Sequence, residues 1–240
     1  MPTIIPPSDK KYVSSLLSSP PQPHNPAIMS TITTLNLQDH IEGGHFVETD
    51  RDPLRVPNPF KSHPQLSGAT AQDGDPETRN ASTTIYYLVT PRSPVGHFHR
   101  NRARTVHTLH WGRARYVVLH ADRATTASSG KETISAKVEV ETFVVGKDLA
   151  RGERLQWIVE GGKFKASFLL PDESEDGDGT TASESEKGCL ISETVVPGFE
   201  YADHDFLTAE GFVESLDAEG REELKWLLRQ DQRARLEELK

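Results

Sequence analysis

Three histidines stand close together in the middle of the chain. His97 and His99 flank Phe98, and His107 follows eight residues after His99. Alternate side chains of a strand point to the same face, so His97 and His99 are expected to face one way together. If His107 joins them, three imidazoles form a site that suits Zn²⁺, Fe²⁺ or Cu²⁺ and leaves coordination positions open for a substrate.

The same region also holds groups that do chemistry without a metal. His99 and His107 are candidates for proton transfer, because imidazole titrates nearest to neutral pH. Lys165 is a candidate base, an anchor for a carboxylate or the amine of a Schiff base. Arg100 is a candidate clamp for an anionic group, with a place along a barrel rim as the structural alternative.

The elements that must position these residues are short strands. β-branched and aromatic runs recur at intervals punctuated by turn residues, and no helices alternate with them. This pattern favours a sandwich or small barrel and not a parallel α/β sheet. The expected strands are Thr83–Val89, Tyr116–His120, Lys137–Val145, Leu155–Val159, Phe164–Leu169 and Cys189–Val196.

The rest of the chain is expected to surround one barrel domain spanning residues 29–212. Residues 1–28 are rich in Pro and Ser and are predicted to be a flexible lead-in. A long loop is expected at 51–78, and a disordered acidic loop at 172–187. Residues 213–240 are predicted to form a C-terminal helix that packs on the barrel or on a partner subunit.

The charge of the chain excludes some classes of partner. The net charge is −9, and the stretch at 172–187 holds seven acids and one lysine, which leaves −9 − (−6) = −3 for the remainder. A nearly neutral body argues against a surface for nucleic acid or anionic membranes, which needs a basic face. Cys189 is the only cysteine, so no disulfide forms within the chain. No signal peptide or spanning segment is evident, and a cytoplasmic location is the expectation.

Four segments taken together resemble the small cupins of the DUF985, or cupin-5, family, which are RmlC-like. These segments are IEGGHFVET at Ile41–Thr49, RNASTTIYYLVTP at Arg79–Pro91, GHFHR at Gly96–Arg100 and VPGFEYADHDF at Val196–Phe206. The resemblance implies an all-β fold, the double-stranded β-helix or jelly roll, with a few peripheral helices, a central cavity for a small molecule and often a homodimer. The activity of the family is mostly unassigned, so the resemblance predicts fold better than function.

The family-like segments add three candidate substrate-binding residues: Glu48, Tyr86 and Tyr201. For both tyrosines, packing in the core with one bonded hydroxyl is an equal alternative. Glu42 precedes a pair of glycines and is assigned to a turn. His204 is expected at the surface.

The metal ligands of cupins in general map only partly onto this chain. His97 and His99 match the histidine pair of the first cupin motif, but Thr105 stands where its glutamate is expected. Lys165 stands where the second motif has its histidine. If Thr105 points inward as the glutamate does, His107 also points inward, and a divalent metal would rest on the three histidines alone. A cavity without a metal is the competing reading.

Three functions remain open at this level. The first is a non-redox isomerase, epimerase, cyclase or lyase in which His99, His107 and Lys165 move protons, with a specialised metabolite pathway as one setting for it. The second is a metal-dependent oxygenase that uses the three histidines. The third is a barrel that binds a small ligand without catalysis.

Overall fold

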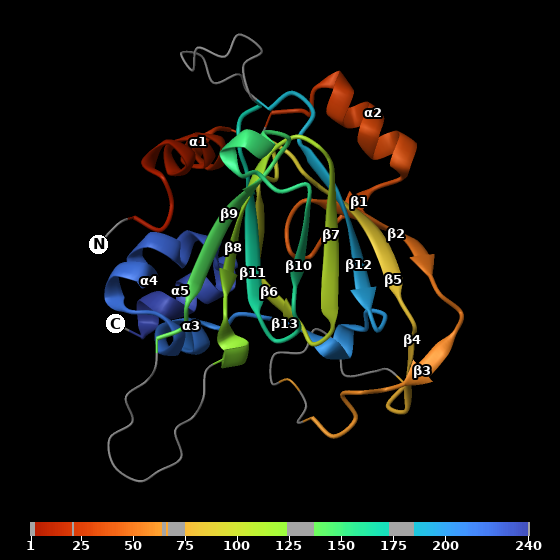
Figure 1. The fold of residues 1–240 in the computed structure, drawn as a ribbon. Helices are drawn as coiled ribbons and strands as arrows, with labels where there is room; N and C mark the ends of the chain where they lie inside the picture. Colours follow the sequence, from red (N-terminus) through yellow and green to blue (C-terminus); the bar gives the residue numbers. More distant parts are fainter. Residues whose placement is uncertain are drawn as a thin grey trace, which may run out of the picture.

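Two antiparallel sheets face each other and form the body of the protein (Figure 1). This computed structural model describes residues 3–20, 22–63, 66, 75–123, 137–172 and 185–239. The first sheet has the order β1 (Gln38–Asp39), β2 (His45–Arg51), β5 (Thr83–Val89), β12 (Cys189–Val196), β7 (Arg104–Trp111), β10 (Gln156–Val159). The second has the order β13 (His204–Phe206), β6 (Val95–Asn101), β11 (Phe164–Leu169), β8 (Ala114–Leu119), β9 (Val140–Val145).

The space between the sheets is filled by one face of each strand. Residues such as Tyr87, Tyr116 and Trp157 form the inner cluster. Alternation along β5 places Tyr87 inside and its neighbours Tyr86 and Leu88 outside, where they pack in a separate cluster. The strand runs identified in the sequence thus do form an all-β barrel, as predicted.

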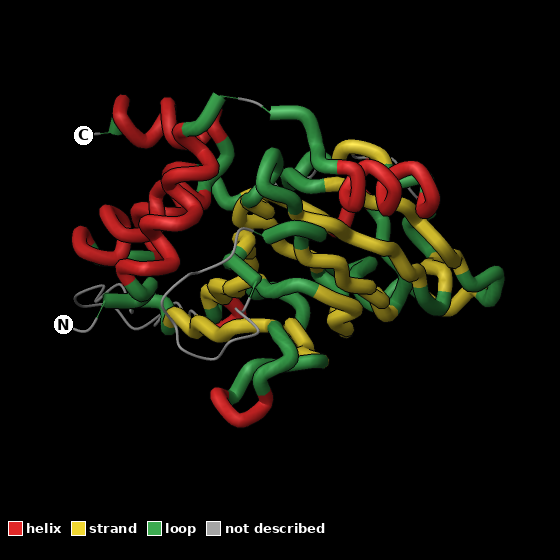
Figure 2. Tube along the Cα trace, turned by 90° about the horizontal axis from the view of Figure 1, so that it is seen from above, coloured by secondary structure: helices red, strands yellow, loops and turns green. Residues whose placement is uncertain are grey.

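Helices cover the outer face of the second sheet (Figure 2). These elements are α1 (Pro7–Ser18), α3 (Ala209–Ser215), α4 (Ala218–Leu224), the 3-10 turn η4 (Lys225–Leu227) and α5 (Gln230–Glu238). The remaining helix, α2 (Pro26–Leu35), packs on the outer face of the first sheet, where Ile32 and Leu35 join the cluster of Leu88 and Leu190. Phe98 and Phe168 from the sheet pack with Phe212, Leu224 and Leu227 from the C-terminal elements. Among the described residues, no helix is both long and apolar enough to cross a membrane.

Two predicted segments differ from the structure. The lead-in is not a flexible tail, because α1 forms within it and buries Val13 fully, and Ile5 joins the same core. The C-terminal helix is broken into shorter pieces. Asp217 caps α4, its side chain accepting a hydrogen bond from the backbone N–H of Gly220.

The two predicted loops lie partly outside the described residues. Within 51–78, β3 (Arg55–Pro57) pairs with β4 (Thr78–Asn80), so this segment is not wholly irregular. The acidic loop falls largely on residues 173–184, which lie outside the described residues.

A tight turn at Gly43 brings Glu42 to the barrel wall. Gly43 has a φ of 99°, and a Cβ there would lie 2.1 Å from the carbonyl oxygen of Val95. We expect Gly43→Ala to lower the free energy of unfolding by about 2 kcal/mol more than Gly152→Ala, since both incur left-handed strain but only Gly43 meets a clash. Gly152 has a φ of 79° with nothing within 4 Å of the added Cβ. Urea unfolding of both variants checks this, and equal losses would contradict it.

Candidate active site

A shift in strand register decides which histidine of β6 faces the barrel. β6 pairs with β11, and the register shifts between Lys165 and Ser167. The extra residue lies in β6 and turns His97 outward, where its Nδ1 is 3.3 Å from the carbonyl oxygen of Leu227. His99 is 5% exposed and faces inward. The prediction that His97 and His99 share a face is therefore wrong, because strict alternation fails at a bulge.

Glu42 is the centre of a buried polar cluster that includes His99. Its Oε1 accepts a hydrogen bond from Nε2 of His204 at 2.9 Å. Its Oε2 lies 3.2 Å from Nε2 of His99 and 3.5 Å from Nδ1 of His40. Glu42 lies in the predicted turn, and that turn places its side chain in the interior, where Glu42 is 7% exposed. His204 is 0% exposed, so the prediction of a surface histidine is wrong.

The hydrogen bonds define where the protons of this cluster lie. Nδ1 of His99 is 2.8 Å from the carbonyl oxygen of His97, and because a carbonyl only accepts, Nδ1 carries the proton. Burial lowers the pKa of His99 to about 3, so the ring is neutral near pH 7 and its Nε2 has a free lone pair beside Glu42. Burial alone raises the pKa of Glu42, but the hydrogen bond from His204 and the nearby ring of His40 oppose burial and lower that pKa.

A second buried cluster joins Lys165, Glu193 and His107. Nζ of Lys165 donates to Oε2 of Glu193 at 2.6 Å and to Nε2 of His107 at 2.8 Å. Burial raises the pKa of Glu193, yet the charge of Lys165 and the bond from it hold that pKa well below its usual range. His107 is stacked on Trp157 with ring centroids 5.0 Å apart. Lys165 and His107 thus face the interior, and Lys165 meets the carboxylate of Glu193 there.

The predicted three-histidine metal site does not fit this arrangement. His97 faces the C-terminal elements. The ammonium of Lys165 donates a hydrogen bond to Nε2 of His107, so the lone pair of this nitrogen is not available to a metal. Thr105, at the expected glutamate position, is bonded to Asn101. Among the described ranges of the chain, no three His, Cys, Asp or Glu side chains are arranged to hold a metal ion. The residues present therefore do not match the ligand set that cupins in general use.

A cavity of about 80 Å³ opens between the two sheets and reaches both carboxylates. Its wall is formed by His40, Glu42, Phe46, Glu48, Arg51, Thr83, Ile85, Asn101, Glu193, Val195, Phe199 and Tyr201. The predicted ligand contacts Glu48 and Tyr201 are on this wall. Glu48 is bonded to Arg51 at 2.8 Å, and Tyr201 is 39% exposed. Oδ1 of Asn101 is buried and has no hydrogen-bond partner among the described residues, so it is an available acceptor.

Two predicted ligand contacts lie outside the barrel. Arg100 points from the outer face of β6, where it binds Asp205 through two bonds of 2.9 and 2.6 Å and covers the ring of Phe164. Tyr86 packs in the outer cluster beside Leu88. Both predictions of substrate contact inside the cavity are wrong. Successive side chains of a strand point to opposite faces, and His99 and Tyr87 take the inward positions next to Arg100 and Tyr86.

One residue that was missed did carry a signal in the sequence. Glu193 alternates with Ile191 and Val195 in an apolar strand, so its parity already placed a carboxylate inside. An acid at an inward position is expensive unless it is paired, which makes it a functional candidate by default. Glu42 and His204 carry no such signal, because neither lies within a long strand.

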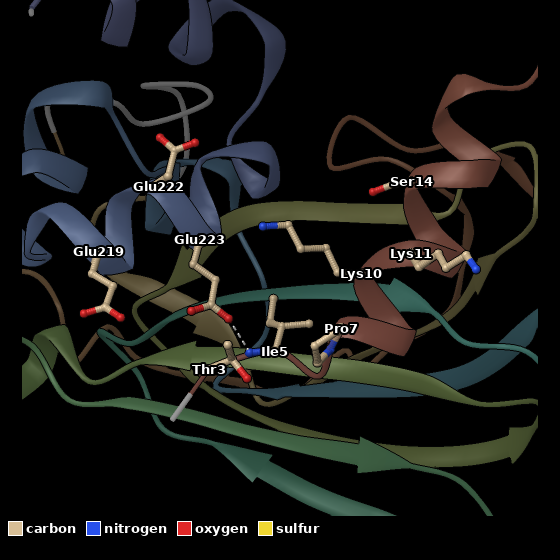
Figure 3. Close-up of a pocket in the computed structure, with 9 residues that line it drawn as sticks. All are labelled: Thr3, Ile5, Pro7, Lys10, Lys11, Ser14, Glu219, Glu222 and Glu223. Carbon is tan, nitrogen blue, oxygen red and sulfur yellow. Dashed lines mark hydrogen bonds between the residues drawn. The ribbon is translucent and has the colours of Figure 1, made fainter. Parts of the chain in front are cut away.

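A larger surface depression lies elsewhere and lacks comparable chemistry. It measures about 620 Å³ and separates α1 from α4, with Lys10, Lys11 and three glutamates along its walls (Figure 3). Glu223 accepts a hydrogen bond from the backbone of Ile5 at 2.6 Å across it. This contact ties the N-terminal segment to α4 and supports a structural role.

Comparisons with known proteins agree with the fold. Residues 29–207 match the family described as Cupin superfamily (DUF985). The uncharacterized protein YML079W of Saccharomyces cerevisiae is 41% identical over 199 residues, which are 82% of this chain and 83% of that protein.

Two solved structures are also similar to this chain. A hypothetical protein from Leishmania major is 29% identical with a TM-score of 0.56, over 79% of this chain and 92% of its own. Protein SO0799 from Shewanella oneidensis is 23% identical with a TM-score of 0.56, over 83% and 96%, and supports the fold alone. The chain therefore belongs to the DUF985 family of the cupin superfamily, and its two facing sheets are the jelly-roll barrel of that fold.

Proposed function

We propose that the barrel cavity binds a small neutral molecule and moves a proton within it, as a non-redox isomerase or lyase. The observation that carries this proposal is a buried carboxylate, Glu42, on the cavity wall with the unprotonated Nε2 of His99 at 3.2 Å. A carboxylate beside an imidazole nitrogen with a free lone pair has the geometry of a general base with a second proton acceptor behind it.

The proposed step begins at a carbon next to a carbonyl group of the substrate. Glu42 takes the proton from that carbon, and the electron pair of the broken C–H bond moves into the carbonyl as an enolate. The proton is shared with Nε2 of His99, while Nε2–H of His204 holds the other carboxylate oxygen in place. Return of the proton to a different atom or face completes an isomerisation, and loss of a leaving group completes an elimination.

The second carboxylate has a different role in this scheme. Glu193 also lines the cavity, but Lys165 balances its charge at 2.6 Å. The paired carboxylate therefore repels a developing enolate less than an isolated one. Lys165 acts here as a positioning and charge-balancing residue.

The walls favour a neutral substrate that carries hydroxyl and carbonyl groups. Glu42, Glu48 and Glu193 repel anions, and Arg51 is already bonded to Glu48 and to Glu200. The cavity of about 80 Å³ is small beside the roughly 300–1,000 Å³ typical of ligand pockets. The substrate, or the part of it that enters, is correspondingly small.

Deuterium exchange tests this proposal without knowledge of the final product. The protein is incubated in D₂O with small hydroxyaldehydes, hydroxyketones and simple sugars, and loss of C–H signals is followed by proton NMR. Exchange at a carbon next to the carbonyl, above a protein-free control, is the expected result. Saturable binding without exchange would contradict a catalytic role and would favour a ligand-binding barrel. The three-histidine oxygenase is not carried forward, because His97 faces away from the cavity.

A further inference from the structure

A second pocket lies on the outer side of the Glu42 turn. It measures about 520 Å³ and is bounded by α2, by β1 and the start of β2, and by the turn between β5 and β6. Its lining residues include His24, Met29, Ile32, Asp39, His45 and Arg92. His40 lines both this pocket and the barrel cavity, so the two spaces share one side chain as a wall.

His45 offers this pocket a buried nitrogen that lacks a partner. Its Nδ1 lies 3.0 Å from Oδ1 of Asp39, and its side chain is 10% exposed. Its Nε2 is buried, and the described part of the chain supplies no hydrogen-bond partner for it. Buried polar atoms almost always form a hydrogen bond. A buried Nε2 without a partner on a pocket wall therefore indicates a ligand that forms a hydrogen bond with it.

The charges around His45 favour an anion. Arg92 is exposed on the turn between β5 and β6 and forms no ion pair with any described residue. The ring of His24 meets that of His45 edge to face with centroids 5.3 Å apart. Asp39 is the only acid among the lining residues, and it lies beside Nδ1 of His45. Burial lowers the pKa of His45, and the charge of Asp39 opposes that shift in part.

We propose that this pocket binds a small organic anion, whose charged group meets Arg92 and His45 and whose apolar part lies on Met29 and Ile32. A guanidinium binds carboxylates and phosphates through two parallel hydrogen bonds. Burial lowers the pKa of His45, so its Nε2 becomes a third donor only when the ring takes up a proton together with the bound anion. Met29 is 45% exposed, so part of an apolar wall is open to an occupant. A divalent cation fits less well, because the free charge of Arg92 repels it.

The position of His40 gives the pocket a second consequence. Nδ1 of His40 is 3.5 Å from Oε2 of Glu42, and the ring also packs on Phe46 and Tyr87. An anion bound in the outer pocket therefore lies against a residue that touches the barrel cluster. The proposal of an anion site in this pocket does not depend on whether the barrel cavity is catalytic.

NMR of histidine-labelled protein tests the site with acetate, butyrate and inorganic phosphate as probes, and sodium chloride at matched ionic strength as the blank. We expect saturable shifts of the ring signals of His24, His45 and His40, with butyrate tighter than acetate if Met29 and Ile32 hold the alkyl chain. Arg92→Gln is expected to weaken binding about tenfold or more, because it removes a charged bidentate donor.

Arg104→Gln is the matched control, since Arg104 is an exposed arginine on β7 that pairs with Glu160 and lies outside the lining of this pocket. The control is expected to bind each probe as the wild type does. Shifts that equal the chloride blank, or equal binding by both variants, would overturn the proposal. Saturable shifts with zinc chloride but with none of the anions would overturn it as well.

Discussion

Lys165→Met is expected to lower the free energy of unfolding by about 3–5 kcal/mol at pH 7, as breaking a buried ion pair typically does. Lys165 is 3% exposed and Glu193 is 6% exposed, so the substitution leaves a carboxylate charge in the interior without its cation. Methionine retains most of the volume of lysine, so the substitution leaves no large cavity that would itself lower the free energy of unfolding. Urea unfolding at pH 7 gives the difference directly.

The control is the double variant Lys165→Met, Glu193→Gln, in which both charges are absent. It is expected to recover most of the loss, since the remaining cost is a neutral amide and not an ion. The deficit of the single variant is also expected to shrink as the pH falls. In the wild type, the folded-state pKa of Glu193 is lowered, so Glu193 contributes stability at pH values above the pKa that it has in the unfolded chain. In the variant, burial without Lys165 raises the pKa of Glu193. Acid therefore neutralises the buried carboxylate of the variant and removes part of its cost. A loss below about 1 kcal/mol, the level of an exposed pair, would show that Lys165 and Glu193 are not paired in the interior.

Alternation of side chains predicts most of this barrel from the sequence. It places His107 and Lys165 inside, and His110 packs against Tyr86 on the outer face, as its parity requires. The position of a bulge is set by packing between strands and not by local pattern, so the sequence does not reveal that His97 turns outward. One extra residue is enough to remove a ligand from the predicted metal site.

The Glu42 cluster shows a different limit. Its members come from β6, from the turn before β2 and from the start of β13, segments far apart in the chain that only the closed barrel brings together. His204 lies 162 positions from Glu42. Nothing local in the sequence distinguishes such residues from turn and surface residues, so the cluster follows from topology.

Glu42→Gln is expected to reduce deuterium exchange into a substrate by about 100- to 10,000-fold, the usual contribution of a general base. Glutamine keeps the shape of the side chain and an oxygen that accepts from His204, but it cannot take a proton from carbon. Exchange rates measured by NMR at equal fractions of folded protein, checked by circular dichroism, separate this loss from unfolding. The readout requires a compound that exchanges with the wild type.

Glu48→Gln provides the matched control, with the same chemical change on the same cavity wall. Glu48 is half-exposed and bonded to Arg51, so its loss is expected to change affinity more than the rate at saturation. If Glu42→Gln exchanges at nearly the wild-type rate, Glu42 is not the base. If Glu48→Gln shows the larger loss, the chemistry lies at the rim and not at the buried cluster.

The central claim is that His99 is a neutral, buried proton acceptor beside Glu42, and its ring nitrogens test this most directly. In ¹⁵N-labelled protein at pH 7, with the His99 signals assigned by comparison with His99→Gln, the account predicts a protonated Nδ1 and an unprotonated Nε2. Because the pKa of His99 is lowered to about 3, the ring is expected to stay neutral as the pH falls through the range where exposed histidines gain a proton. A doubly protonated ring at pH 7, or a proton on Nε2 alone, would contradict the account.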